Sequence, residues 1–260
     1  MRILFVGDVV GRAGRLALSE RLGRLVDRHN VDLVVANGEN AAAGFGLTAD
    51  VADELFDLGI DVLTSGNHIW DKKEVVEILE REERLLRPAN YPGDAPGRGA
   101  AVFHTPGGVP VGVLNLEGRV FMSNIDCPFR CADHQLAEMQ KKTSIILVDF
   151  HAEATSEKMA LCWYLDGRVS AIVGTHTHVQ TADERVLPNG TAFISDVGMT
   201  GSRDGVIGMR REAIIEKFLT QRPARFEVAK NDPVLSAVVI DIDEETGRAR
   251  RIDRVMELIG

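Results

Sequence analysis

Short apolar runs alternate with stretches of helical periodicity along the first third of the chain. Three of the apolar runs are predicted strands: 2–7, 32–36 and 61–65. Between the first and second runs, residues 13–29 carry leucines at helical spacing. Between the second and third runs, Thr48 is placed to cap a second helix. Asp71 is predicted to open a third helix over residues 72–82. Strands that alternate with helices in this way predict parallel βαβ units.

The pattern changes in the middle of the chain and then resumes. Residues 88–110 are rich in Pro and Gly, which predicts a hairpin or meander, and residues 117–133 are predicted to be an excursion loop. Residues 234–243 and 248–256 are predicted to pair as a hairpin. The other predicted elements are strands at 101–104, 111–116, 145–150, 169–174 and 191–196, and helices at 134–142, 155–165 and 206–221.

Parallel units early in the chain and antiparallel strands later predict an α/β fold with two mixed β-sheets. We expect the sheets to pack face to face as a sandwich flanked by helices, within one domain over residues 1–260. A hydrophobic fraction of 45% and a charged fraction of 27% are ordinary for a globular protein. The net charge of −9 argues against a stable nucleic-acid surface, because phosphate binding needs clustered Lys and Arg.

The cysteine count and the apolar segments predict where the protein works. The chain has three cysteines, Cys127, Cys131 and Cys162, and this odd, low count does not indicate a disulfide framework or a four-ligand zinc site. The apolar N-terminal stretch is too short for a signal-peptide core, and no run approaches the roughly 18 apolar residues of a membrane span. We therefore expect a cytoplasmic protein with reduced thiols and no membrane partner.

Five polar clusters each follow an apolar, strand-like run. They are Gly7-Asp8, Gly38-Glu39-Asn40, Gly66-Asn67-His68, His151 and Gly174-Thr175-His176-Thr177-His178. In α/β sheets ligands bind outside the carboxyl ends of the strands, so the clusters can converge on one edge. Carboxylate, amide and imidazole groups are ligands that divalent metals take. The pattern predicts a metal-dependent hydrolase.

Each cluster alone also has an ordinary explanation. Asp8 could cap the next helix, Glu39 could lie in a solvated loop, and Asn67 could form a turn that exposes His68. His176 and His178 would point to the same side if they lay on a strand, and could reach one site from a loop as well. The joint order of the clusters is more specific than any member.

That order resembles the calcineurin-like metallophosphoesterase superfamily. Over essentially its full length the chain is similar to the YmdB-like branch. That branch carries Gly-Asp-x-x-Gly, Asn-Gly-Glu-Asn-Ala and Asp-Val-Gly-Met-Thr-Gly, which are Gly7–Gly11, Asn37–Ala41 and Asp196–Gly201 here. The resemblance implies a four-layer αββα sandwich with a site for two divalent metal ions.

The resemblance also implies a role for each cluster residue. Asp8 and His178 match ligands of the first metal, and Glu39 matches the carboxylate that bridges both metals. The second-metal ligands are matched by Asn67, His151 and His176. His68 matches the catalytic histidine, which with Asn67 also meets the substrate. The superfamily usually has Asp-x-His at the first motif, where this chain has Val10, and Asn40 is the nearest replacement ligand.

The implied activity is hydrolysis of small phosphodiesters, most notably 2′,3′-cyclic nucleotides, by a hydroxide that two cations activate. A ligand set without thiolate fits iron or manganese well, and magnesium or zinc are further candidates. The resemblance also implies a homo-oligomer. A regulatory protein that binds a nucleotide or phosphate through Gly7–Gly14, with weak turnover, is the alternative. A Rossmann-type oxidoreductase is disfavoured, because Val9 stands where the dinucleotide fingerprint needs a glycine.

Overall fold

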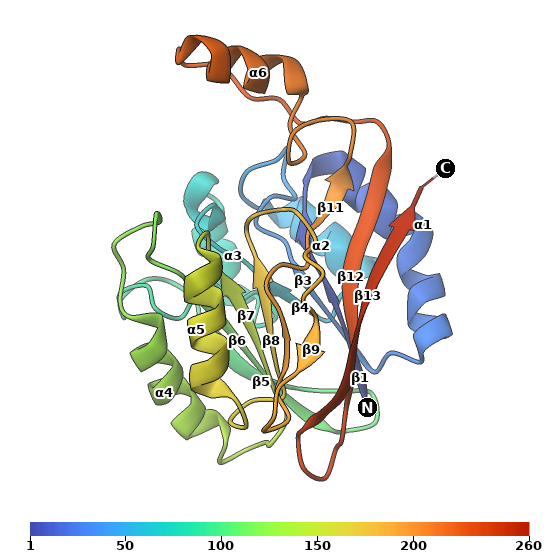
Figure 1. The fold of residues 1–260 in the computed structure, drawn as a ribbon, viewed down its shortest axis with the longest axis vertical. Helices are drawn as coiled ribbons and strands as arrows, with labels where there is room; N and C mark the ends of the chain where they lie inside the picture. Colours follow the sequence, from blue (N-terminus) through green and yellow to red (C-terminus); the bar gives the residue numbers. More distant parts are fainter. Residues whose placement is uncertain (260) are drawn as a thin grey trace.

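The computed structural model describes residues 1–259, in which two β-sheets pack face to face with helices outside them (Figure 1). The first sheet has the order β2-β11-β12-β1-β3-β4, with β13 paired to β12, and the second has the order β5-β6-β7-β8-β10-β9. The first sheet contains β1 (Arg2–Val6), β2 (Asp8–Val9), β3 (Leu33–Asn37), β4 (Val62–Thr64), β11 (Met199–Ser202), β12 (Pro233–Ile242) and β13 (Ala249–Leu258). The second contains β5 (Ala100–His104), β6 (Pro110–Glu117), β7 (Ile146–His151), β8 (Ala171–Thr175), β9 (Arg185–Val186) and β10 (Ala192–Ile194).

The strand pairing is mixed, as the sequence predicted. In the first sheet β1 pairs in parallel with β3 and β3 with β4, while β12 pairs antiparallel with β1 and β13. In the second sheet β6, β7, β8 and β10 are parallel, and β5 forms an antiparallel hairpin with β6. Buried side chains from both sheets, such as Phe5, Val35, Val113 and Leu147, meet in one apolar cluster. This shared core confirms the predicted sandwich.

Helices cover the outer faces of the two sheets. The helices are α1 (Gly11–His29), α2 (Ala49–Asp57), α3 (Val75–Arg81), α4 (Pro128–Met139), α5 (Thr155–Leu165) and α6 (Arg211–Thr220). Leu22 of α1 and Leu55 of α2 pack on the first sheet, and Leu136 of α4 and Leu161 of α5 pack on the second. These buried positions follow the helical spacing in the sequence. Helix α6 instead stands away from the body (Figure 1).

Several predicted boundaries were wrong for identifiable reasons. The helix predicted to start beside Asp71 begins at Val75, because Asp71 lies in a short 3₁₀ helix, η1 (Ile69–Asp71), and pairs with His68. The last part of the predicted excursion loop belongs to α4, which has Pro128 in its first turn, where its missing N–H costs nothing. The helix predicted from residue 206 starts at Arg211, since residues 206–209 form a backbone-bonded turn.

Candidate metal centre

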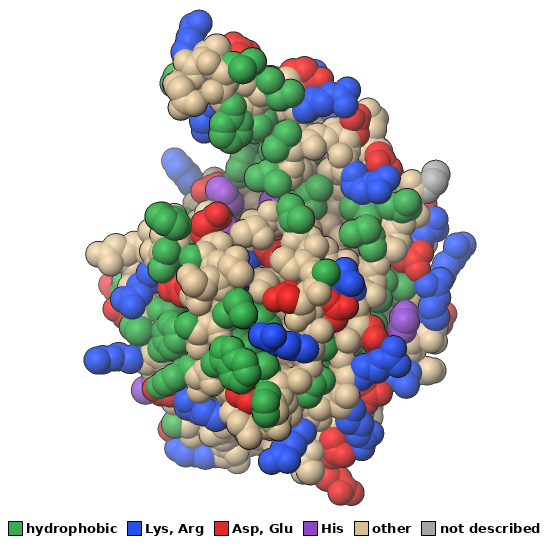
Figure 2. Space-filling view, in the orientation of Figure 1, with side chains coloured by type: hydrophobic (Ala, Val, Ile, Leu, Met, Phe, Trp, Pro, Cys, Tyr) green, Lys and Arg blue, Asp and Glu red, His purple; other side chains and the backbone are tan. Residues whose placement is uncertain are grey.

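The carboxyl ends of five parallel strands bring the predicted residues to one edge of the sandwich. β1 ends two residues before Asp8, β3 two residues before Glu39 and β4 three residues before Asn67, while His151 is the last residue of β7. β8 ends one residue before His176. Histidine side chains are visible in the hollowed surface between α6 and the body (Figure 2). The strand topology therefore makes this edge the candidate site.

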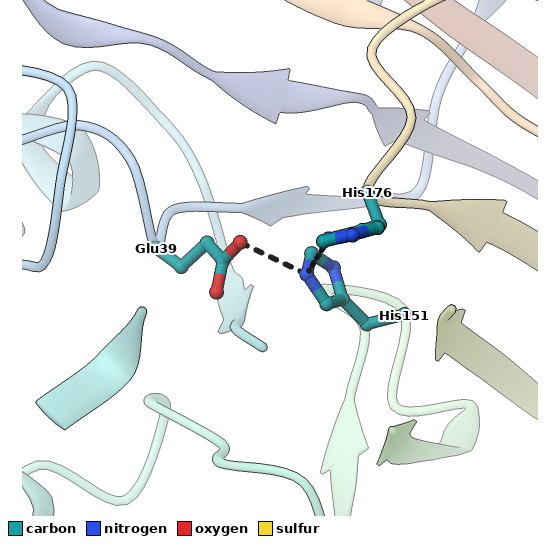
Figure 3. A group of neighbouring side chains, drawn as sticks. All are labelled: Glu39, His151 and His176. Atoms are coloured by element: carbon teal, nitrogen blue, oxygen red, sulfur yellow. Dashed lines mark hydrogen bonds and ion pairs between the residues drawn. The ribbon is translucent and has the colours of Figure 1, made fainter. Parts of the chain in front are cut away.

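The first group of side chains surrounds Nε2 of His151. This atom lies 2.9 Å from Oε1 of Glu39, 3.0 Å from Nδ1 of His176 and 3.0 Å from Oδ1 of Asn67. Figure 3 shows Glu39 and both imidazoles pointing toward one another from three different elements. Glu39, His151 and His176 each offer a ligand atom, and these atoms lie within 4.8 Å of one another. The donor set of carboxylate, amide and imidazole fits a divalent cation.

The second group lies around Oδ1 of Asp8. Nε2 of His178 is 3.8 Å from this oxygen. Nδ2 of Asn40 lies 3.3 Å from Nε2 of His178 and 3.3 Å from Oε1 of Glu39, so Glu39 contacts both groups. Oδ1 of Asp8 is buried and has no hydrogen-bond donor among residues 1–259. A buried carboxylate oxygen without a donor is costly, and a bound cation would satisfy it.

The pKa shifts in the site have the pattern expected for a cation site. Burial, the largest single effect, would raise the pKa of Glu39, but the charge and hydrogen bond of His151 together with those of His68 lower it to about 2. Burial would lower the pKa of His151, but the charge and hydrogen bond of Glu39 together with the charges of Asp8 and Asp149 raise it to about 9. Burial and the adjacent His151 lower the pKa of His176 to about 3, so its imidazole is neutral and has a free lone pair. The buried carboxylates thus require positive charge beside them.

The His-x-His segment reaches the site from a loop rather than from a strand. β8 ends at Thr175, and both His176 and His178 have positive φ values, 96° and 66°. The same-side argument based on strand alternation was therefore wrong, and the loop alternative is what the structure shows. The two imidazoles go to different groups, His176 to the group around His151 and His178 to that around Asp8.

His68 lies next to the ligand groups and contacts Glu39, Asp71 and Phe45. Its backbone N–H donates to Oε2 of Glu39 at 2.8 Å. Its Nδ1 is 2.8 Å from Oδ2 of Asp71, and the ring of Phe45 packs edge-on at a centroid distance of 5.0 Å. A carboxylate on Nδ1 fixes the tautomer and leaves Nε2 for a ligand or substrate.

The glycines of the Gly7–Gly14 segment serve chain packing. A Cβ on Gly7 would lie 1.9 Å from the carbonyl oxygen of Gly198, and one on Gly14 would lie 2.3 Å from that of Thr200. These positions need glycine because β11 passes directly against them. The phosphate-loop alternative was based on these glycines, and close backbone packing explains them without a bound phosphate.

Sequence comparison places the chain in a family. The model of YmdB-like proteins matches residues 4–255. The chain belongs to the YmdB-like family. It is 52% identical to the 2′,3′-cyclic-nucleotide 2′-phosphodiesterase of Bacillus subtilis, with 98% of this chain and 97% of that protein covered. This result confirms the family resemblance inferred from the motifs.

Solved structures agree with the assigned fold. A hypothetical protein from Thermus thermophilus superposes with a TM-score of 0.93 and 44% identity, covering 99% of each chain. A phosphatase from Mycoplasma pneumoniae has a TM-score of 0.92 and 33% identity, covering 99% of this chain and 93% of that one. Within residues 1–259, no helix has the length and apolar character needed to cross a membrane.

Two buried acidic residues at this edge, Asp149 and Glu117, were not among the predicted site residues. Asp149 is buried on β7 below His151, and its oxygens accept from the hydroxyls of Thr64 at 2.6 Å and Thr175 at 2.7 Å. Oγ1 of Thr175 also lies 2.9 Å from Nδ1 of His151. Glu117 ends β6 and pairs in register with His151. Glu117 follows an apolar run in the sequence, which is the feature that identified the five polar clusters.

Glu117 is fully buried, and neither carboxylate oxygen has a hydrogen-bond partner in the described part of the chain. Burial raises its pKa to about 7, although the nearby His151 opposes the shift. The adjacent Asn90 fixes its backbone, donating from Nδ2 to the carbonyl at 2.8 Å and accepting from the N–H at 2.9 Å. With this raised pKa the carboxyl beside the ligand cluster is neutral below pH 7 and ionises only as the pH rises through that value.

Proposed function

We propose that this protein is a metal-dependent phosphodiesterase that hydrolyses 2′,3′-cyclic nucleotides. The observation that carries the proposal is the position of Glu39, whose Oε1 contacts Nε2 of His151 at 2.9 Å and Nδ2 of Asn40 at 3.3 Å. A carboxylate with two oxygens between two ligand groups is suited to bridge two cations. The activity of the Bacillus subtilis relative supports the same reaction and substrate class.

The two groups provide ligands for two divalent ions. Asp8, His178 and Asn40 would hold the first ion, and Glu39 would contact both. Rotation of the Asn40 amide by 180° would present its oxygen to the cation instead of Nδ2. The second ion would be held by Asn67, His151 and His176. Oxygen and nitrogen ligands without a thiolate favour iron or manganese, with magnesium and zinc as further candidates.

The chain itself supplies a proton donor beside the ligand groups. When bound, the ions would polarise the phosphate and lower the pKa of a coordinated water. In its imidazolium form, with Nδ1–H donated to Asp71, His68 would give the proton on Nε2 to the departing sugar oxygen and become the neutral imidazole. The bond from its backbone N–H to Glu39 keeps the ring at a fixed position relative to the cluster. Asn67 and His68 would together contact the substrate phosphate.

Metal analysis combined with a diesterase assay tests this function. The purified protein should contain divalent metal and hydrolyse 2′,3′-cyclic AMP, with activity lost after chelation and restored by Mn²⁺ or Fe²⁺. Glu39→Gln should lower kcat/KM by more than about 100-fold, since it removes a shared ligand charge. Glu54→Gln is the matched control, because Glu54 pairs with Arg15 on an exposed surface at 2.7 Å.

Unchanged turnover of the Glu39→Gln variant at saturating Mn²⁺ would exclude the proposed centre. A regulatory nucleotide-binding protein would instead bind 2′,3′-cyclic AMP equally well with and without metal, and Glu39→Gln would leave that binding intact. Homo-oligomerisation, a cytoplasmic location and a single domain over residues 1–260 stay predictions from the sequence.

A further inference from the structure

The loop that carries His176 and His178 has an unusual backbone. Both residues have positive φ values, 96° and 66°, in a region that side chains with a Cβ rarely adopt. Such conformations persist only where the surrounding structure holds them in place. The contacts that hold this loop therefore decide whether the two imidazoles reach the site.

A buried ion pair spans the loop. Lys158 of α5 and Asp196, which follows β10, are 2% and 1% exposed and meet at 2.8 Å. Nζ of Lys158 also donates to the carbonyl oxygen of Thr175 at 2.7 Å, directly before His176. Oδ2 of Asp196 accepts from the N–H of Thr177 at 3.0 Å and from its hydroxyl at 2.7 Å. The ion pair is therefore hydrogen-bonded to the backbone of Thr175 and Thr177, the residues on either side of His176.

The second oxygen of Asp196 secures the other end of the loop. Oδ1 accepts from the N–H of Gly198 at 2.8 Å, and the next residue, Met199, donates its N–H to the carbonyl of His178 at 3.2 Å. Gly174, just before the loop, packs directly against the backbone of Ser195, because a Cβ there would lie 1.8 Å from the carbonyl oxygen of Ser195. One carboxylate is therefore linked to the backbone around both imidazoles.

We propose that Lys158 and Asp196 are positioning residues that hold the Thr175–His178 loop in its ligand-presenting conformation and so set the metal affinity of the site. Both side chains are buried, and among residues 1–259 their other hydrogen bonds end on Thr175 and Thr177 of this loop and on Gly198. Groups behind metal ligands typically change metal affinity by about 10- to 100-fold when removed. This inference rests on the metal centre of the proposed function.

The test compares two Thr→Val variants that each remove a hydrogen-bonded hydroxyl, one part-buried with a single bond and one buried with two. Thr177→Val removes the hydroxyl bond to Asp196. Thr191→Val removes the hydroxyl of Thr191, which donates to the carbonyl of Val169 at 2.7 Å and accepts from the N–H of Gly167 at 2.9 Å, at the far end of the same sheet. Metal-free protein is titrated with Mn²⁺ by calorimetry, and Tm is measured without metal.

We expect both variants to have a lower metal-free Tm, but only Thr177→Val to raise the Kd for Mn²⁺, by about tenfold. Thr177→Ser keeps a hydroxyl and should restore the wild-type Kd. Lys158→Met should weaken Mn²⁺ binding as well, because it frees the carbonyl of Thr175 while Asp196 keeps its three other donors.

The possible outcomes distinguish a failure of the positioning role from a failure of the proposed metal centre. Wild-type Mn²⁺ affinity in the folded Thr177→Val and Lys158→Met variants would overturn the positioning role and leave the metal centre intact. Equal weakening by Thr191→Val would also overturn it, since the effect would then follow from general destabilisation. A wild-type protein that binds no Mn²⁺ or other divalent metal would overturn the metal centre, and the positioning role with it.

Discussion

Replacing His68 with alanine should slow the chemical step without removing metal. The ring of His68 contacts Asp71 and Phe45, and only its backbone N–H touches the ligand Glu39 among the bonds found in residues 1–259. The backbone bond survives the substitution. The variant should therefore retain the metal content of the wild type, in contrast to Glu39→Gln.

The size of the effect follows from the position of the ring. General acid catalysis contributes about 10²- to 10⁴-fold, or roughly 3–5 kcal/mol of barrier. The side chain of His68 is 31% exposed, so water can reach the leaving oxygen and supply part of the lost function. We therefore expect a loss near the lower end, about 100- to 1000-fold in kcat for 2′,3′-cyclic AMP.

The assay that identifies a proton donor compares two leaving groups. The sugar oxygen of a cyclic nucleotide leaves as an alkoxide and needs a proton, whereas p-nitrophenolate leaves without one. His68→Ala should therefore lower kcat for bis(p-nitrophenyl) phosphate by less than about tenfold. His104→Ala is a control, because His104 is exposed at the end of β5, opposite the carboxyl ends of the parallel strands. Equal losses on both substrates, or loss of metal, would refute the proton-donor role.

Three further substitutions test other parts of the site. Asp71→Asn should lower kcat by about tenfold with metal content unchanged, because the tautomer of His68 loses its charged partner. Gly66→Ala should weaken Mn²⁺ binding by at least about tenfold in calorimetry, because its Cβ would lie 2.1 Å from Cδ2 of His151. Burial raises the pKa of Glu117 from 4.5 to about 7, so ionisation costs the folded state up to about 3 kcal/mol, and metal-free protein should lose stability as the pH rises through this window. Glu117→Gln should remove that loss in thermal melts at pH 5 and pH 8, and an unchanged pH dependence would show that Glu117 does not cause it.

The positions of the clusters could be predicted from sequence because they follow from strand topology. Parallel strands end on one edge, so any polar residue directly after an apolar run is a candidate for that edge. The same rule would have found Glu117, which ends β6 beside His151. Asp149 is harder to recognise, since it interrupts the apolar run of β7 two residues before His151 and reaches that ligand through Thr175 and Asn37.

The conformation of the His-x-His loop could not be predicted from its own residues. Its backbone depends on Lys158 and Asp196, which lie on either side of it in sequence and belong to a helix and a turn. A lysine in a helix is normally exposed to solvent, so the neighbouring sequence does not predict that Lys158 is buried. Asp71 was misassigned for a related reason: an acidic residue before a helix is a typical cap, and its pairing with His68 depends on tertiary geometry.

The departure from the superfamily pattern at Val10 has a structural explanation. Val10 is fully buried and fills space next to Gly201 and Gly208, where added Cβ atoms would lie 3.1 Å and 2.9 Å from it. Its side chain therefore packs against the glycines of the loops behind the site. Nδ2 of Asn40 lies 3.3 Å from Nε2 of His178. An amide oxygen in place of an imidazole nitrogen would give the proposed first site harder ligands, which would favour manganese over zinc there.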